Sequence, residues 1–429
     1  MVLRVRKRIA RSRVPVALAA FAAAGALGGC GALNRAGAQS ARADAAADMA
    51  ATCPAVALQT LGKIATRVYR EGVQSERTAV ALRLIGASQP LRAAVESGDR
   101  AKAREAALAL VATGHLTDLK VVRGSTVLAE VGDAAVAPLH GTLTGAGGKP
   151  LARFTTSVWS DGGLLAETSG ITEGIAVLRE RDRSGAGRTI AGALQLPSGR
   201  LGTQGTLSRG QTTYAYTSQP VAAYPSGRPL REYVLRTVGS LSGLCGRDAS
   251  ETTVNTLSRI ARLIYAGEAG ARTGPLVDRV QSDRPLLSAV ARRDPRATRA
   301  AVVALLHHHI VRLRISAGGR VLADVGGPYV LAPVAAPLRL GASTIGSLLL
   351  SIQDDEGYKR LAQRLVGLDV LMYMGGRLVK STVGLSPGAV PTRGSFAYRG
   401  RSYRAYTFYA RAFPSGPLRI TVLIPIPYA

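Results

Sequence analysis

The sequence predicts an α+β fold that consists of two tandem copies of one module, each a long N-terminal helix packed on an antiparallel sheet. Three short segments recur in the same order at nearly constant offsets, which is typical of an internal repeat. Each copy begins with apolar residues at helical spacing and continues with short alternating segments separated by glycines, as expected for helices followed by strands.

The recurring segments define the extent of the two copies. They are 127–132 with 321–326 and 157–163 with 351–357, both at the same offset, and 224–231 with 413–419, at a slightly smaller one. We therefore expect domain one over residues 53–238 and domain two over residues 245–428. The segment between them, 239–248, is rich in Ser and Gly and is expected to be a linker.

The second copy shows each element most clearly. A helix is expected over 253–265, and a second helical pattern over 286–307 is interrupted at Asp294-Pro295, a pair that suits a helix start. Strand patterns follow, with Gly318-Gly319 and Gly375-Gly376 as turns. The expected later elements are strands 311–316, 320–325 and 347–352, helix 358–366, strands 369–373 and 377–382, two strands within 395–413, and a closing strand 418–424.

Residues 1–30 have the features of a secretory signal peptide. Six basic side chains lie within 1–13, and an apolar run at 14–27 follows. At about 1.5 Å per residue, this run is too short to cross the ~30 Å hydrocarbon core of a bilayer. The segment Leu27-Gly28-Gly29-Cys30 resembles the lipobox of bacterial lipoproteins. The resemblance implies that Cys30 is lipidated, that residues 1–30 form the leader and that 31–52 form a flexible tether.

An ordinary signal-peptidase site at Ala36-Gly37-Ala38 remains an alternative and would give a secreted protein. The lipobox instead implies attachment to the outer face of the cytoplasmic membrane. The net charge of +28 would attract anionic lipids, wall polymers or nucleic acid. Export favours the first two of these partners over nucleic acid.

Several short motifs resemble the Cache (PDC) sensor domains, which are extracytoplasmic relatives of PAS domains. They are the long first helix, the hairpin Gly-Arg-Val-Leu-Ala-Asp at 319–324, the strand start Ile345-Gly346-Ser347, and the closing segment 417–425. The resemblance implies a small-molecule pocket over the sheet and a relay of ligand occupancy to the membrane or to a partner. No segment matches the amino-acid-binding motif of that family, so the ligand class stays open.

The resemblance also bears on the cysteines. Cache-like modules bring the start of the first helix close to the end of the last strand, so Cys53 and Cys245 could meet after lipidation of Cys30. Such a disulfide would stabilise the protein by roughly 4–5 kcal/mol on the chain-entropy model. Two unpaired thiols at duplicated positions are the alternative.

Candidate ligand-binding residues come from a comparison of the copies, because residues shared by both copies serve the fold and those that differ are better site candidates. Tyr and Arg alternate along 398–413, so one face of these strands could present them to an anionic or aromatic ligand. The alternative is an ordinary strand with two amphipathic faces. The candidates are Trp159, Tyr373, Tyr398, Tyr403, Arg404 and Tyr406.

Other reactive residue types are better explained by structure. Adjacent residues of His307-His308-His309 do not share a face, so we expect no metal site. Ser226 and Ser415 lie in duplicated Pro-Ser-Gly turns. Asp161 and Asp354-Asp355 suit strand ends or helix N-caps. With no nucleophile and base set, we expect no enzyme and no cofactor.

The sequence therefore predicts a non-enzymatic, extracytoplasmic sensor lipoprotein that binds a small molecule and signals through a separate membrane partner. The alternative is an envelope protein whose Arg-rich surface holds anionic wall polymers or lipids.

Overall fold

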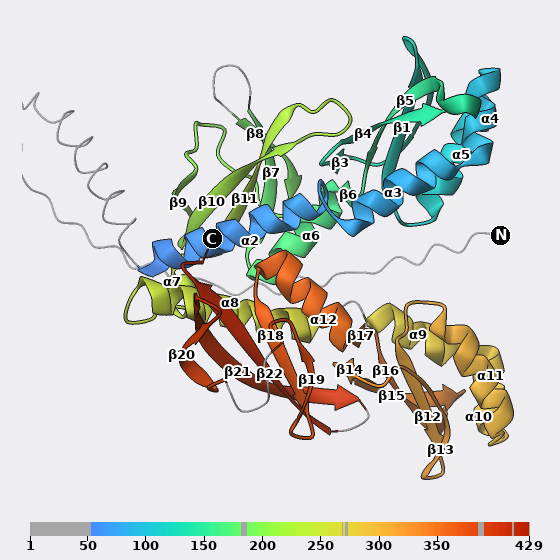
Figure 1. Cartoon of the computed structure of the whole chain (residues 1–429), viewed down its shortest axis with the longest axis vertical. Helices are drawn as coiled ribbons and strands as arrows, with labels where there is room; N and C mark the ends of the chain where they lie inside the picture. Colours follow the sequence, from blue (N-terminus) through green and yellow to red (C-terminus); the bar gives the residue numbers. More distant parts are fainter. Residues whose placement is uncertain are drawn as a thin grey trace, which may run out of the picture. The chain divides into compact units, whose positions relative to one another are not determined.

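The computed structural model describes residues 53–181, 187–267, 269–270, 273–384, 390–413 and 416–428. The expected leader, the tether, Cys30 and Ser415 lie outside the described residues. The described chain consists of two repeats with matching element order, in which helices are followed by a sheet, a further helix and a second sheet (Figure 1).

Repeat 1 comprises the elements from α2 to β11. Its helices are α2 (Cys53–Glu71), α3 (Glu76–Ala87), α4 (Gln89–Ser97), α5 (Arg100–Ala112) and α6 (Asp161–Thr172), with a short 3-10 turn at Ala146–Gly148. Its strands are β1 (Asp118–Arg123), β2 (Thr126–Gly132), β3 (Ala135–Val136), β4 (Leu139–Thr144), β5 (Pro150–Ser157), β6 (Trp159–Ser160), β7 (Ile175–Arg181), β8 (Gly187–Gly192), β9 (Gln204–Arg209), β10 (Thr212–Ala222) and β11 (Pro229–Thr237).

Repeat 2 comprises the elements from α8 to β22, and the short helix α7 (Val238–Ser242) lies in the expected linker. Its helices are α8 (Ala249–Gly267), α9 (Gly274–Ser282), α10 (Arg284–Ala291), α11 (Pro295–Leu306) and α12 (Asp355–Leu361), which continues as the π-helical turn η2 (Ala362–Val366). Its strands are β12 (Arg312–Ala317), β13 (Arg320–Gly326), β14 (Val330–Leu331), β15 (Val334–Leu340), β16 (Ser343–Ser351), β17 (Gln353–Asp354), β18 (Asp369–Met374), β19 (Arg377–Ser381), β20 (Arg393–Tyr398), β21 (Arg401–Phe413) and β22 (Gly416–Ile426).

Each repeat contains two main antiparallel sheets. The first sheets have the orders β2-β1-β5-β4 and β13-β12-β16-β15. The second sheet of repeat 1 has the order β8-β7-β11-β10-β9, and that of repeat 2 has seven strands in the order β17-β14-β21-β22-β18-β19, with β20 also paired to β21. In repeat 1, β3 and β6 form a separate two-stranded sheet. The α+β class with antiparallel pairing is confirmed. The sequence predicted one sheet per copy, whereas the chain leaves the first sheet after β5 or β16, passes through the short strand β6 or β17, forms a helix and then continues into the second sheet. Alternation alone does not tell which strands pair.

Local residue choices explain the element boundaries that the sequence predicted well. The Asp294 carboxylate accepts hydrogen bonds from two backbone N–H groups at the start of α11, and Pro295 occupies the first helical position. Gly318 and Gly319 both adopt positive φ in the turn between β12 and β13, which side chains disfavour. Helix α11 and this hairpin therefore form where they were predicted.

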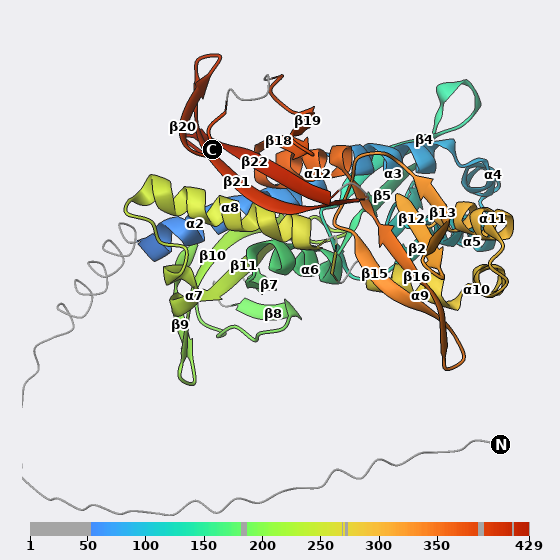
Figure 2. The ribbon, with the colours of Figure 1, turned by 90° about the horizontal axis from the view of Figure 1, so that it is seen from below.

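The two long helices, α2 and α8, pack against each other and each covers the second sheet of its own repeat (Figures 1 and 2). Their apolar residues recur at helical spacing and are buried in one core that both repeats share. These residues are Leu58, Leu61, Ile64 and Val68 in α2, and Val254, Leu257, Ile260 and Ile264 in α8. Neither repeat therefore completes its core alone.

A tyrosine in the last turns of each long helix fixes that helix to the second sheet of its own repeat. The Tyr69 hydroxyl of α2 accepts a hydrogen bond from the backbone N–H of Ala222 at 3.0 Å. In repeat 2, the Tyr265 hydroxyl accepts one from the Arg411 N–H at 2.9 Å and donates one to its carbonyl at 2.7 Å. Tyr69 of α2 and Tyr265 of α8 are therefore equivalent positions in the two repeats.

A disulfide joins the starts of the two long helices. Cys53 is the first residue of α2, Cys245 lies just before the start of α8, and their Cα atoms lie 5.5 Å apart. The two helices run in the same direction from this bond (Figure 1). The bond therefore connects the repeats at one end of their shared helical layer.

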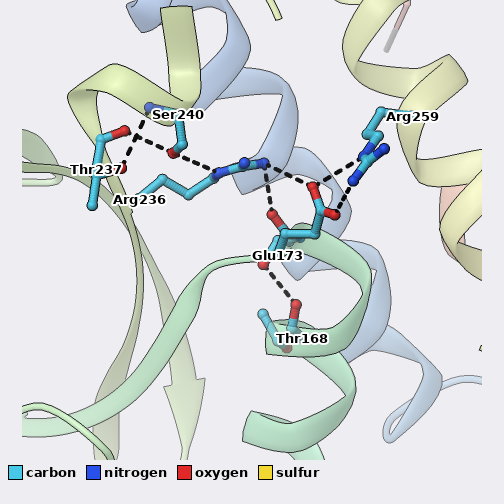
Figure 3. A network of polar contacts seen from close by, with 7 residues as sticks. Thr168, Glu173, Arg236, Thr237, Ser240 and Arg259 are labelled. Atoms are coloured by element: carbon cyan, nitrogen blue, oxygen red, sulfur yellow. Dashed lines mark hydrogen bonds and ion pairs between the residues drawn. The ribbon is translucent and has the colours of Figure 1, made fainter. Parts of the chain in front are cut away.

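Ion pairs cross between the repeats at two further places. Glu173, which ends α6 in the left-handed conformation, accepts hydrogen bonds from Arg259 of α8 at 2.6 and 3.2 Å (Figure 3). Arg236 approaches the same carboxylate at 3.6 Å and donates to Ser240, which places α7 in this network. These charges, mainly Arg259, hold the pKa of Glu173 below its usual range. The second crossing pair joins Arg364 of η2 to Glu71 of α2.

We expect the disulfide to contribute about 2–5 kcal/mol to the free energy of unfolding, because it closes a long loop in the unfolded chain, with its cysteines 192 residues apart. The double variant C53S/C245S, compared with the parent in a C30S background, should lose that amount in denaturant unfolding. Detection of two reactive thiols in the unreduced C30S protein would contradict the pairing.

Candidate ligand-binding site

Trp159 lies at the junction of the two sheets in repeat 1. It is half-buried in β6, and the Arg77 guanidinium lies over its ring at 5.2 Å from the ring centre. Gly72 packs so closely on the indole that a Cβ atom there would clash with the ring. Trp159 therefore has close packing partners from the helical region of its own repeat.

Tyr373, Tyr398 and Tyr403 come together on the outer face of the second sheet of repeat 2, the face directed away from α8. Tyr373 and Tyr403 are buried, and the Arg419 guanidinium lies 3.9 Å from the Tyr373 ring centre. Tyr398 and Tyr403 line an open hollow of about 570 Å³ together with Arg399. Half of the predicted residues thus share one face.

Arg404 and Tyr406 lie on the opposite face of β21, which is directed toward α8. Tyr406 is half-buried beneath the Arg262 guanidinium, which is 5.2 Å from the ring centre and hydrogen-bonds the hydroxyl. Arg404 is exposed and lines a smaller hollow with Glu251. The structure therefore does not assemble the six predicted residues into one site.

The remaining motifs have structural roles where the chain is described. The Asp354 carboxylate caps α12 by accepting from the Gly357 N–H at 2.6 Å, as predicted. Ser226 accepts from the Arg228 N–H within its turn. His307 ends α11, and all three adjacent histidines are exposed. Among the described residues, no three metal-ligating side chains gather closely enough to hold an ion.

A larger hollow lies on the open face of the first sheet of repeat 1. The opposite face of this sheet packs on helices α3, α4 and α5, so the polar side chains of the hollow point away from the core, to which Phe154 belongs. Its volume is about 690 Å³. Its lining residues come from β1, β4, β5 and the turn after β10, and they are Lys120, Val122, His140, Gly141, Thr142, Arg153, Phe154, Thr155, Pro225 and Ser226.

The polar groups of this hollow are mostly donors or cations. Lys120 is paired with Glu130 of the neighbouring strand at 2.9 Å, and His140 Nδ1 lies 3.2 Å from the Thr155 hydroxyl. Arg153 is exposed on β5. Two cations, a histidine and several hydroxyls can hold a small anion through charge-assisted hydrogen bonds.

The same face of repeat 2 is built differently. The ladder positions of Lys120 and Glu130 hold Arg314 and Asp324 there, and the position of Asp118 holds Arg312. Both arginines hydrogen-bond Asp324, and their guanidinium carbons lie 4.9 and 5.3 Å from the centre of the Phe413 ring. Phe413 corresponds to Tyr224 of repeat 1, so the copies differ here in the second arginine on the shared carboxylate, while Ala335 and Ser347 on this face of repeat 2 remain exposed.

Further positions around the hollow have also diverged. Thr155, His140 and Arg153 correspond by strand register to Leu349, Ala335 and Ser347. These polar residues of repeat 1 were not predicted from the sequence, because they lie outside the segments that recur between the copies. A position-by-position comparison of the copies beyond the matching motifs would have identified them.

Two titratable groups beside the hollow, Asp118 and Tyr224, have raised pKa values. Asp118 is almost fully buried, and burial raises its pKa to about 6. Burial also raises the pKa of Tyr224, with the charges of Asp118 and Glu130 adding to the effect. The Tyr224 hydroxyl therefore stays protonated and donates to the Thr155 carbonyl at 3.1 Å.

A second difference between the copies is a buried acid. Glu232 of β11 is fully buried on the side of the sheet that faces α2 and α6, and Gln219 donates to it at 2.5 Å. Its second oxygen and the Thr168 hydroxyl of α6 have no hydrogen-bond partner among the described residues. Repeat 2 has Ile420 and Phe408 at the paired positions, so the fold itself does not require a carboxyl group here.

No protein-family model matches the chain, and no curated protein matches it. Among solved structures, it is similar to an extracellular ligand binding receptor from Desulfohalobium retbaense DSM5692, at 10% identity and a TM-score of 0.22. The match spans 39% of this chain and 40% of the receptor, less than half of either. Within the described part of the chain, no helix has both the length and the apolar character needed to cross a bilayer.

Burial raises the pKa of Glu232 from about 4.5 to about 7, which makes stability depend on pH. Below about pH 4.5 the carboxyl group is neutral in both the folded and the unfolded state. As the pH rises toward 7, the unfolded state releases the proton first, so the free energy of unfolding should fall by about 3 kcal/mol. Denaturant unfolding at pH 4.5 and 8 measures this loss.

The variant E232Q should abolish that loss, because its side chain does not ionise. E180Q, which changes a partly exposed glutamate on β7, serves as the control and should retain it. Equal pH dependence in the parent and in E232Q would contradict the assignment.

Proposed function

We propose that the protein is a non-enzymatic, extracytoplasmic ligand-binding protein that takes a small carboxylate- or phosphate-bearing molecule in the first-sheet hollow of repeat 1. The observation that carries the proposal is the divergence of the two first sheets. Repeat 2 holds Arg312 and Arg314 on Asp324 beside Phe413 and has Leu349 and Ala335 at the positions of Thr155 and His140, whereas repeat 1 has a polar hollow of about 690 Å³.

The chemistry of the hollow supports an anionic ligand. Lys120 and Arg153 supply charge, and Thr142, Thr155 and Ser226 supply hydroxyl groups around them. Its volume lies within the usual range of small-molecule sites. The basic net charge would further attract an anion from solution.

The wider proposal places the protein on the outer face of the cytoplasmic membrane through a lipid on Cys30. A bound ligand would shift the balance between two arrangements of helices and sheets, and a separate membrane partner would detect that shift. The contact between α2, α6 and the second sheet supports such a relay, because these elements join repeat 1 to repeat 2. The ligand-binding proposal depends on the hollow alone. The similarity to a solved structure that is named as an extracellular ligand binding receptor is no part of its support.

The alternative is an envelope protein that holds anionic wall polymers through many dispersed arginines. Such binding would be strongly weakened by salt and would not depend on any particular pair of cations. The two proposals therefore predict different responses to local substitutions.

A thermal-shift screen with small carboxylates and phosphate esters should find at least one stabilising compound. The variant K120A/R153A should weaken its binding about tenfold or more, because each charge-assisted hydrogen bond contributes about 1.5–3 kcal/mol. Isothermal titration calorimetry at low and moderate salt measures the Kd.

The matched control is R320A/R339A, which removes the same charge from exposed positions on the first sheet of repeat 2. It should leave binding of the compound unchanged. An equal loss in both double variants would favour the envelope alternative, and a screen without any stabilising compound would overturn the proposed ligand site.

A further inference from the structure

A separate, mainly apolar hollow lies where the helices of the two repeats meet. Helix α6 of repeat 1 forms one wall, and α8, α12 and η2 of repeat 2 form the others. Its volume is about 330 Å³, at the lower end of the range for ligand pockets. Leu263, Ile264, Leu361 and Leu365 line it, together with Gly170 and Gly267.

Because the repeats contain matching elements, the contact between α6 of repeat 1 and α8 of repeat 2 has a counterpart between η2 of repeat 2 and α2 of repeat 1. This counterpart is the equivalent place to the apolar hollow. Helix α6 corresponds to α12 and η2, since Glu173 and Gly367 end these segments in the left-handed conformation. Counting back equally from these two ends, Gly170 corresponds to Arg364.

The equivalence of the long helices follows from their tyrosines. Tyr69 of α2 and Tyr265 of α8 make the same contact with the second sheet of their own repeat. Counting forward equally from these tyrosines, Glu71 corresponds to Gly267. Gly170 and Gly267 of the apolar hollow thus each have a charged counterpart in the equivalent place.

The equivalent place is occupied by the protein's own side chains. Arg364 and Glu71 form an ion pair across it, and the Glu71 side chain is only 13% exposed. One helix contact between the repeats is thus filled by two long charged side chains. In the other contact, glycines stand at both of those positions and leave the hollow.

Close packing does not account for these glycines. A Cβ atom at Gly170 or Gly267 would meet no heavy atom within 4 Å, and neither residue has positive φ. Gly170 lies within α6, where glycine costs about 1 kcal/mol relative to alanine. A residue that weakens the helix without a packing role is consistent with space kept open for another molecule.

We propose that this hollow binds a small, uncharged, mainly apolar molecule that takes the place filled by Arg364 and Glu71 in the equivalent contact. The walls are aliphatic. The ionisable group among its lining residues, Glu167, already interacts with Arg77, so the rim does not call for a charged ligand.

Such a molecule would contact helical segments from both repeats. Binding to the folded state would therefore stabilise the packed pair of repeats by a free energy that grows with the logarithm of the ligand concentration above the Kd. The hollow is separate from the polar one on the first sheet, so each proposal can fail without the other.

The neutral fluorescent probe N-phenyl-1-naphthylamine tests the site in the purified protein. We expect saturable binding with a stoichiometry of one and a fluorescence increase on transfer from water. The variant G170R/G267E, which copies the ion pair into the hollow, should lower the affinity for the probe at least tenfold while the disulfide and the melting transition persist.

The reverse variant, E71G/R364G, removes the ion pair from the equivalent contact and should raise the stoichiometry toward two. G170L provides a second way to fill the hollow should the charged variant not fold, and it should likewise lower the affinity for the probe at least tenfold. Unchanged probe binding in either folded filling variant, or no saturable binding in the parent, would overturn the proposal.

Discussion

The packing of α2 against α8 is the constraint on which the rest of the structure depends. Each of these helices covers its own second sheet and also contacts the other helix, so the apolar residues of both repeats enter one core. Separation of the repeats would expose that core to water, and each Å² of apolar surface exposed would cost about 25 cal/mol of free energy. The disulfide and the Glu173–Arg259 pair hold the same layer by covalent and polar contacts.

Duplication allows fold and function to be separated within one chain. Positions with the same role in both repeats include Tyr69 and Tyr265, and also Ser157 and Ser351, whose hydroxyls donate to the carbonyls of β3 and β14. Positions that have diverged concentrate at the open first sheet, the buried Glu232 and the helix hollow. Repeat 2 has Ile420 at the position of Glu232, and Leu349 and Ala335 at the positions of Thr155 and His140, so the fold can form without these polar residues of repeat 1.

The sequence predicted elements whose signals are local and missed features that depend on distant partners. Asp294-Pro295 and Gly318-Gly319 act through the backbone of their own segment, so the helix start and the hairpin could be placed. Tyr403 and Tyr406 could not be assigned to a site, because α8 covers one face of β21 and side chains from β20 and the loop before it cover the other. Alternation of apolar and polar residues along a strand predicts a solvent-exposed face only where one face of the sheet is covered and the other is open. Glu232 was missed for a related reason: burial by α2 and α6 is a property of the packed repeat.

Helix α6 connects the diverged places to one another. It starts directly after β5 and β6, and β5 carries Arg153 and Thr155 of the polar hollow. Thr168 in its middle faces the buried Glu232, and Gly170 faces the apolar hollow. Its last turn leads to Glu173, which pairs with Arg259 of repeat 2. A displacement of α6 by a ligand in either proposed site, or by ionisation of Glu232, would therefore act on the same contact between the repeats.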